Sequence, residues 1–118
     1  MDKILIVEED TGVRDAYKRQ LGDRVQALYA EDLDAASDLF SANRDIVLIT
    51  VSGRPPAKDK EMHAEDFIRR VRKTFSGPIV TTSFFADRRR AAREAGADHH
   101  AEKGALPTKI FELLKIEL

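Results

Sequence analysis

Short runs of apolar residues alternate with longer amphipathic stretches along the chain. The runs have the length and β-branched content of strands, and the stretches between them repeat apolar residues at helical spacing. Strict alternation of strand and helix indicates a parallel sheet covered by helices on both faces. The residues expected to form strands are 4–7, 25–29, 46–49, 79–83 and 98–102.

The stretches between the strands carry signals for the start and end of helices. We expect helices to begin at Asp10 or Thr11, at Asp32 and near Pro107, and to end at Gly22, at the pair 77–78 and at Gly96. The expected apolar faces are Val13, Tyr17 and Leu21; Leu33, Ala36 and Phe40; Ala64, Phe67, Ile68, Val71 and Phe75; and Ile110, Phe111, Leu114 and Leu118.

Three segments differ from this regular pattern. The run 46–49 is the most continuously apolar, which is typical of a central strand covered on both faces. The run 98–102 is poorly apolar and is expected at an edge of the sheet. Residues 51–60 contain a glycine and two prolines and predict a loop.

Composition narrows the class of protein. A length of 118 residues indicates one domain, and 42% hydrophobic with 35% charged residues is ordinary for a globular chain. The net charge of −1 gives no global attraction to nucleic acids or anionic membranes. The absence of cysteine excludes disulfides and thiolate catalysis. The run 4–7 is too short for a signal peptide, and no run approaches the ~18–20 apolar residues of a membrane span. We therefore expect a cytoplasmic protein.

Polar residues follow the predicted strands. Glu8 and Glu9 come after the first strand, Thr50 after the third, Ser83 ends the fourth, and Lys103 follows the fifth. Parallel sheets of this kind place their sites beyond the carboxyl ends of the strands. The five side chains are therefore expected to meet at one edge of the sheet.

The segments around these residues resemble the receiver domain of two-component response regulators. Residues 4–10 (ILIVEED) resemble the opening strand and acidic pair, residues 78–83 (PIVTTS) resemble the fourth strand, and residues 95–103 (AGADHHAEK) resemble the segment leading to the lysine of that family. The resemblance extends over residues 1–118 as a single receiver-like domain. It implies the flavodoxin-like receiver fold, a doubly wound (βα)5 sheet of five parallel strands in the order 2-1-3-4-5, with two helices on one face and three on the other.

The resemblance also implies a phosphoryl-transfer site that this chain alters. In receivers the acidic pair holds Mg²⁺, an aspartate ending the third strand accepts a phosphoryl group, the lysine contacts it, and the hydroxyl responds. Here Thr50 stands at the aspartate position, and no acidic residue occurs between Asp45 and Asp59. A threonine hydroxyl is neutral at pH 7 and cannot form an acyl phosphate. Glu8 and Glu9 can still bind a metal, although their longer side chains displace it.

Three further positions depart from the family pattern. The proline that follows the acceptor in receivers has no clear counterpart, since Pro55 and Pro56 lie in an altered loop. Gly104 follows Lys103 where the family has a proline, so we expect a trans peptide bond there. His100 stands in place of the switching aromatic residue.

Each candidate site residue also has a purely structural interpretation. Glu8 and Glu9 form either a residual Mg²⁺ or Ca²⁺ site or an ion pair with Lys103 that closes the pocket. Thr50 is either a modified hydroxyl or a packed β-branched residue. Ser83 can simply bond to the local backbone.

The histidines and arginines near the end of the chain raise similar alternatives. His99 and His100 are either a pH switch or metal ligands, or a partly exposed pair pointing to opposite faces. The cluster Arg88, Arg89, Arg90 and Arg93 is either a docking surface or a solvated face with an Arg90–Glu94 pair. Of Phe84 and Phe85, at least one is expected in the core.

The sequence predicts a signalling module that is not an enzyme, since P-loop, dinucleotide, nucleophile-elbow and zinc-protease patterns are absent. We expect a degenerate receiver that binds a kinase, output or scaffold protein without aspartyl phosphorylation, through a surface including Arg88, Arg89, Arg90, Arg93 and His100. It would need no cofactor, apart from weak Mg²⁺ at Glu8 and Glu9, and no membrane or nucleic acid. It would be a monomer, or a homodimer through the fourth helix, fifth strand and fifth helix.

Two alternatives stay open. One is a metal-dependent receiver phosphorylated at an unusual residue, and the other is a nucleotide- or nucleic-acid-binding module that uses residues 88–90.

Overall fold

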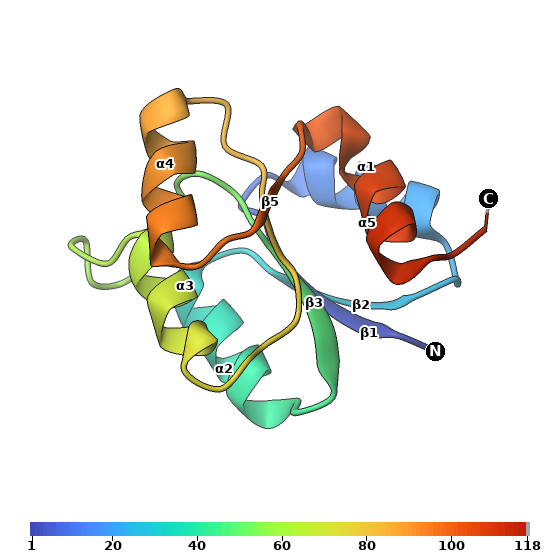
Figure 1. The fold of residues 1–118 in the computed structure, drawn as a ribbon, viewed down its shortest axis with the longest axis horizontal. Coiled ribbons are helices and arrows are strands. Elements are labelled where there is room, and N and C mark those ends of the chain that lie inside the picture. Colours follow the sequence, from blue (N-terminus) through green and yellow to red (C-terminus); the bar gives the residue numbers. More distant parts are fainter. Residues whose placement is uncertain (118) are drawn as a thin grey trace.

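The computed structural model describes residues 1–117, in which strands and helices alternate from the first element to the last (Figure 1). The predicted alternation is confirmed. The elements are β1 (Lys3–Val7), α1 (Thr11–Leu21), β2 (Gln26–Ala30), α2 (Leu33–Ala42), β3 (Ile46–Val51), α3 (Ala64–Arg72), β4 (Ile79–Thr81), α4 (Ala86–Ala95), β5 (His99–His100), the 3-10 turn η1 (Lys103–Ala105) and α5 (Leu106–Leu114).

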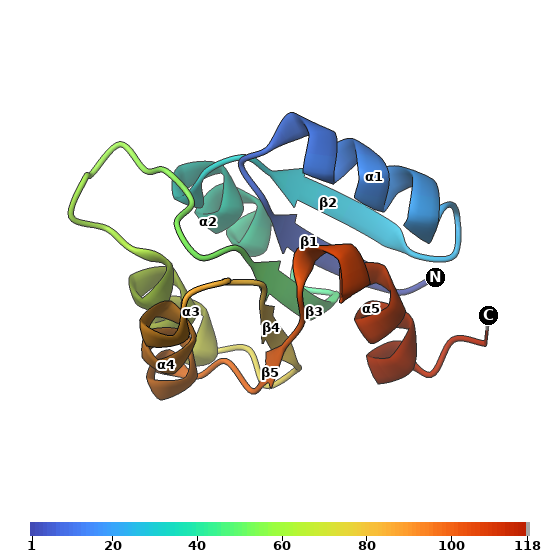
Figure 2. The ribbon, with the colours of Figure 1, turned by 90° about the horizontal axis from the view of Figure 1, so that it is seen from above.

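The strands form one parallel sheet in the order β2-β1-β3-β4-β5, as the resemblance implied. Helices α1 and α5 lie on one face, and α2, α3 and α4 lie on the other (Figure 2). The sheet is thus the middle layer of three. Its carboxyl edge collects the turns that follow β1, β3, β4 and β5.

Side-chain alternation along the strands divides the core into two parts. Ile4 and Ile6 of β1 pack with α1 and α5, whereas Leu5 and Val7 pack with the helices of the opposite face. All four are at most 1% exposed. Burial on both faces explains why this strand has a continuous apolar sequence instead of an alternating one.

The predicted helix caps are largely confirmed. The Asp10 carboxylate accepts from the amide of Val13 at 3.0 Å, and that of Asp32 accepts from Ala35 at 2.7 Å. Gly22 ends α1 with a φ of 58°. These contacts satisfy amides and carbonyls that helix ends leave unpaired.

The predicted end of the third helix is wrong. Helix α3 ends at Arg72, before the glycine–proline pair at 77–78. In the turn that follows, the Arg72 guanidinium forms the hydrogen bonds that the backbone carbonyls would otherwise accept from a continuing helix. It donates to the carbonyl oxygens of Phe75 at 3.0 Å and Gly77 at 2.6 Å. Phe75 follows the helix but is still packed in the core, as expected.

Three predicted strand boundaries need correction. β3 continues through Val51, which pairs with β1, so the loop begins at residue 52. β4 and β5 are shorter than predicted because the edge pairing joins only two residues of each strand. Next to it, the Asp98 carboxylate accepts from the amide of Ile79 at 2.8 Å in place of a strand partner.

The expected apolar face of α5 is confirmed at Ile110 and Phe111, which are buried, while Leu114 is partly buried. Leu118 lies outside the described residues. None of the helices within 1–117 has the length and apolar composition needed to cross a bilayer.

Candidate functional site

The predicted site residues lie along the carboxyl edge of the sheet. Glu8 contacts Lys103, and Glu9 lies beside it on the turn that follows β1. Thr50 is buried within β3, between β1 and β4. Ser83 is buried at the same edge, where it lines a hollow together with Lys103 and its hydroxyl accepts from the amide of Phe85 at 3.3 Å. The local backbone bond predicted for Ser83 is therefore confirmed.

Glu8 and Lys103 form an ion pair at the centre of this edge. The Lys103 Nζ lies 2.9 Å from Oε1 of Glu8, whose residue is 1% exposed. The other oxygen, Oε2, accepts from the amide of Asp10 at 3.0 Å. Oε1 receives no well-directed hydrogen bond from the described residues, so its charge is balanced by the ammonium alone. The predicted pairing of a glutamate with Lys103 is confirmed.

Glu9 is held by a residue that the sequence did not single out. The Ser52 hydroxyl donates to Oε2 of Glu9 at 2.6 Å, and the Ser52 amide donates to the carbonyl of Val7 at 3.1 Å. Ser52 is 2% exposed. Ser52 lies two residues beyond Thr50 and therefore on the same side of an extended chain. This spacing was the signal in the sequence that Ser52 belongs to the site.

Thr50 is a packed strand residue. It lies opposite Ile6 on one side and Val80 on the other, and it is 1% exposed. The structural interpretation of this residue, a β-branched side chain packed at the end of a strand, is confirmed. Its neutral hydroxyl brings no negative charge to the site.

A tyrosine of α1 lies close to the acidic pair. Tyr17 is 2% exposed, and its hydroxyl finds no hydrogen-bond partner among the described residues. Burial raises the pKa of this phenol far above its ordinary value, and the carboxylates of Glu8 and Glu9 raise it further. The phenol therefore stays neutral even at pH values above its ordinary pKa.

The residues at this edge do not fit a magnesium ion of the receiver type. Mg²⁺ requires several hard oxygen ligands. Within 1–117 no three acidic or histidine side chains come together, and Glu8 and Glu9 are already engaged by Lys103 and Ser52. A metal at Glu8 and Glu9 would have to displace both contacts.

The turn after Lys103 also differs from the pattern of the family. The peptide bond before Gly104 is trans, as predicted, and residues 103–105 form a 3-10 turn that leads directly into α5. This turn fixes the backbone from which the Lys103 side chain reaches Glu8.

The arginines of α4 do not form one uniform surface. Arg90 and Arg93 are exposed, whereas Arg88 is half-buried with Nη1 3.8 Å from Oε1 of Glu65 on α3. Among the ion pairs of the described chain, none joins Arg90 to Glu94. Arg88 therefore braces α4 against α3.

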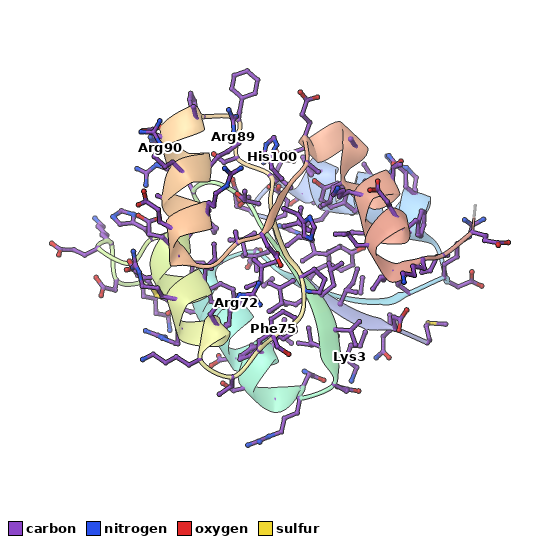
Figure 3. All side chains as sticks on the ribbon, viewed as in Figure 1. Lys3, Arg72, Phe75, Arg89, Arg90 and His100 are labelled. Atoms are coloured by element: carbon purple, nitrogen blue, oxygen red, sulfur yellow. The ribbon has the colours of Figure 1, made fainter. Side chains whose placement is uncertain are left out.

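Arg89 and His100 lie near one another at the carboxyl edge, with Arg90 on the same helix (Figure 3). Arg89 donates to the carbonyl of Phe84 at 2.8 Å. Nε2 of His100 lies 3.0 Å from the carbonyl oxygen of Ser83 and donates to it. His99 is half-buried and His100 exposed, consistent with side chains on opposite faces. Arg89 and His100 thus each bond to a carbonyl of the turn that connects β4 to α4.

The expectation that Phe84 or Phe85 belongs to the core is wrong. Phe84 is 84% exposed and Phe85 is 56% exposed. The physical reason is that β4 ends at Thr81 and the Ser83 hydroxyl bonds to Phe85, so the chain leaves the sheet before either ring can reach the core.

Solved structures similar to this chain include response-regulator domains. A two-component response regulator from Clostridium difficile matches with a TM-score of 0.81 and 19% identity, over 98% of this chain and 97% of that chain. The chemotaxis protein CheY4 of Vibrio cholerae matches with a TM-score of 0.77 and 21% identity, over 100% and 99% of the two chains. A response regulator receiver domain from Methylobacillus flagellatus gives 0.78 and 20%, over 99% of each.

The chain has the receiver fold of two-component signalling proteins. No family model and no curated protein matches the sequence. Identities near 20% establish the fold alone, so what the site can do has to be argued from its residues.

Proposed function

We propose that this protein is a cytoplasmic pseudo-receiver that acts in signal transduction by binding other proteins, without accepting a phosphoryl group on an aspartate. The observation that carries the proposal is the ion pair between the buried Glu8 and the partly exposed Lys103, 2.9 Å apart, at the same edge as a neutral Thr50. A phosphoryl acceptor of this fold would need these groups to be available to the incoming phosphate and metal.

Phosphoryl transfer depends on an aligned nucleophile, a metal and a cation that neutralises charge. The nucleophile position holds Thr50, whose hydroxyl would need a base to become reactive. The cation, Lys103, is neutralised by Glu8, and the second carboxylate, Glu9, accepts from Ser52. Each of the three requirements is thus weakened by a different residue, which supports a binding role over a chemical one.

The surface proposed for partner binding comprises α4, β5 and α5. Arg90, Arg93 and His100 are exposed there, and Arg89 is partly exposed. Binding through this surface requires no group at Thr50. The proposed partner is a kinase, an output protein or a scaffold, and the proposed module is a monomer or a homodimer through the same surface.

The proposal is tested by incubating the protein with acetyl phosphate and Mg²⁺ and measuring its intact mass. We expect no phosphorylated species, because no carboxylate stands at the end of β3. The Thr50→Asp variant serves as the matched control, since it restores the nucleophile alone. A phosphorylated species in the wild-type protein would refute the proposal, and its absence from a Thr50→Val variant would assign the phosphoryl group to Thr50.

A further inference from the structure

Two phenylalanine rings stand out from the turn between β4 and α4. Phe84 is 84% exposed and Phe85 is 56% exposed, and among residues 1–117 the other large exposed apolar side chains are Met1 and Val47. The two rings contact each other edge to face, with centroids 5.8 Å apart. We call this pair the aromatic ridge. Adjacent exposed aromatic rings are typical of binding sites, whereas single exposed apolar residues are common on any surface.

The aromatic ridge is held outward by specific contacts. The amide of Phe85 donates to the Ser83 hydroxyl at 3.3 Å, and Arg89 donates to the carbonyl of Phe84 at 2.8 Å. The guanidinium of Arg54, from the loop after β3, lies 5.7 Å from the centre of the Phe85 ring. The backbone that carries the rings is therefore fixed before a partner binds, which lowers the entropy cost of binding.

Two hollows with cationic side chains in their linings lie near the ridge, the first beside Phe84 and the second beside Arg54, which contacts the Phe85 ring. One has a volume of about 360 Å³ and includes Phe84 with Arg89, His100 and Lys103 in its lining. The other has a volume of about 430 Å³ and includes Arg54, Lys60 and Arg88. Each hollow also contains one acidic residue, Glu102 in the first and Asp59 in the second. Lys103 and Arg88 already pair with Glu8 and Glu65. The side chains that remain to meet a carboxylate are Arg89 in the first hollow and Arg54 and Lys60 in the second.

We propose that the aromatic ridge and its two hollows form a docking site for an acidic peptide segment that carries apolar side chains. The apolar side chains would pack on Phe84 and Phe85, and the carboxylates would enter the two hollows. This inference rests on the proposed binding function and specifies its partner by charge and polarity. Arginine and aromatic residues together are the side chains that most often dominate binding energy at protein interfaces.

Other occupants match these observations less well. A second copy of the chain in a two-fold arrangement would place the same basic hollows against each other, which charge repulsion opposes. A nucleic acid would need an uninterrupted basic track for its phosphates. Here Asp59, Asp87 and Glu102 interrupt the surface.

The test is an amide NMR titration of the full chain with a synthetic 12-residue peptide that alternates glutamate with leucine and phenylalanine. We expect shifts at residues 54, 83–90 and 100, and at least tenfold weaker binding by the Phe84→Ser/Phe85→Ser variant. Both rings are exposed, so this variant should keep the wild-type melting temperature. Val47→Ser is the matched control because it removes an exposed apolar side chain elsewhere and should leave binding unchanged.

Two further peptides separate the contributions. A peptide with serine in place of its apolar residues, and one with lysine in place of glutamate, should each bind at least tenfold more weakly. Any of three results would overturn the inference. These are equal binding of the serine peptide, unchanged binding by the double variant, and no amide shifts at millimolar peptide. Tighter binding of a single-stranded oligonucleotide at the same residues, or dimerisation abolished by Phe84→Ser/Phe85→Ser, would overturn it in favour of another occupant.

These outcomes are independent of phosphorylation, because the peptide is titrated without Mg²⁺ or a phosphate donor. Peptide binding combined with phosphorylation of the wild-type protein would refute the pseudo-receiver and leave the docking site intact. No peptide binding combined with no phosphorylation of the wild-type protein would refute the docking site alone.

Discussion

The charge of Glu8 is compensated by a single side chain, that of Lys103. Glu8 is almost fully buried, while the Lys103 side chain is 39% exposed. Removing the lysine leaves a buried carboxylate without its cation, and such charges are costly in a protein interior. The two residues that receivers use for catalysis therefore have a role in stability here.

We expect Lys103→Met to lower the free energy of unfolding by about 1–2 kcal/mol, less than for a fully buried pair because water still reaches the ammonium. Chemical denaturation at pH 7 measures the change. Lys109→Met is the control, since Lys109 pairs with the exposed Glu112 at 3.5 Å and should cost less than ~0.5 kcal/mol. If adding Glu8→Gln to Lys103→Met recovers none of the loss, the ion pair is not its cause.

Tyr17 gives a prediction that depends on pH. Its hydroxyl is buried without a partner, so Tyr17→Phe should match or exceed the wild-type stability at pH 7, by up to about 1 kcal/mol. Burial raises the pKa of Tyr17 in the folded protein above the ordinary value of 10.0. The unfolded chain therefore releases this proton first, and wild-type stability falls as the pH rises above about 10.

The stability advantage of Tyr17→Phe should consequently grow between neutral pH and pH values above 10. Denaturation of both proteins across this range measures it, and the difference between them isolates Tyr17 from the lysines that titrate nearby. A constant difference across the range would show that Tyr17 ionises equally easily in the folded and unfolded states.

The roles of individual residues could be predicted from the sequence where a local rule applies. Asp10, Asp32 and Gly22 end helices by rules that involve only neighbouring residues. The contact between Ser52 and Glu9 could not be predicted, because it joins residues 43 positions apart whose approach depends on strand register. The exposure of Phe84 was not predicted either, because an aromatic residue after a strand is more often buried.

At the level of the elements, one arginine joins α3 to the turns around β4 and β5. The Arg72 guanidinium donates to the carbonyl of Gly96 at 2.9 Å, as well as to those of Phe75 and Gly77, and lies 3.3 Å from Asp98. It also stacks 5.8 Å from the Phe75 ring. Figure 3 shows Arg72 and Phe75 near the end of the sheet opposite His100.

We expect Arg72→Ala to lower the free energy of unfolding by about 2–4 kcal/mol, because it removes several charge-assisted hydrogen bonds at once. Arg69→Ala, on the same helix, removes only an exposed pair with Asp66 and should cost less than about 0.5 kcal/mol. Thermal and urea denaturation compare the two variants. Equal losses would contradict the role assigned to Arg72.

The type and order of the elements could be predicted from the sequence, while several of their ends could not. Apolar runs and cap residues are local signals, and they placed every strand and helix. The early end of α3 depends on Arg72 reaching across a turn, and the shortness of β4 and β5 depends on their pairing at the edge. These are tertiary effects.

At the level of the whole molecule, the chain has the receiver fold, and at its carboxyl edge Glu8 pairs with Lys103 while Glu9 accepts from Ser52. Matches of 0.77 to 0.81 in TM-score show how closely the backbone follows receiver domains. The packing that determines this backbone involves the two core clusters and not the residues of the site. The fold therefore does not depend on an acidic residue at position 50, where this chain has Thr50.

The most direct test of this account is an amide NMR titration with Mg²⁺ and beryllofluoride, a mimic of the phosphoryl group. We predict no shifts at residues 8, 9, 50, 83 and 103 of the wild-type protein. The Thr50→Asp variant, which adds a third carboxylate beside Glu8 and Glu9, provides the comparison, and a receiver domain known to bind beryllofluoride confirms the reagents. Saturable shifts at these five residues of the wild-type protein would contradict the account.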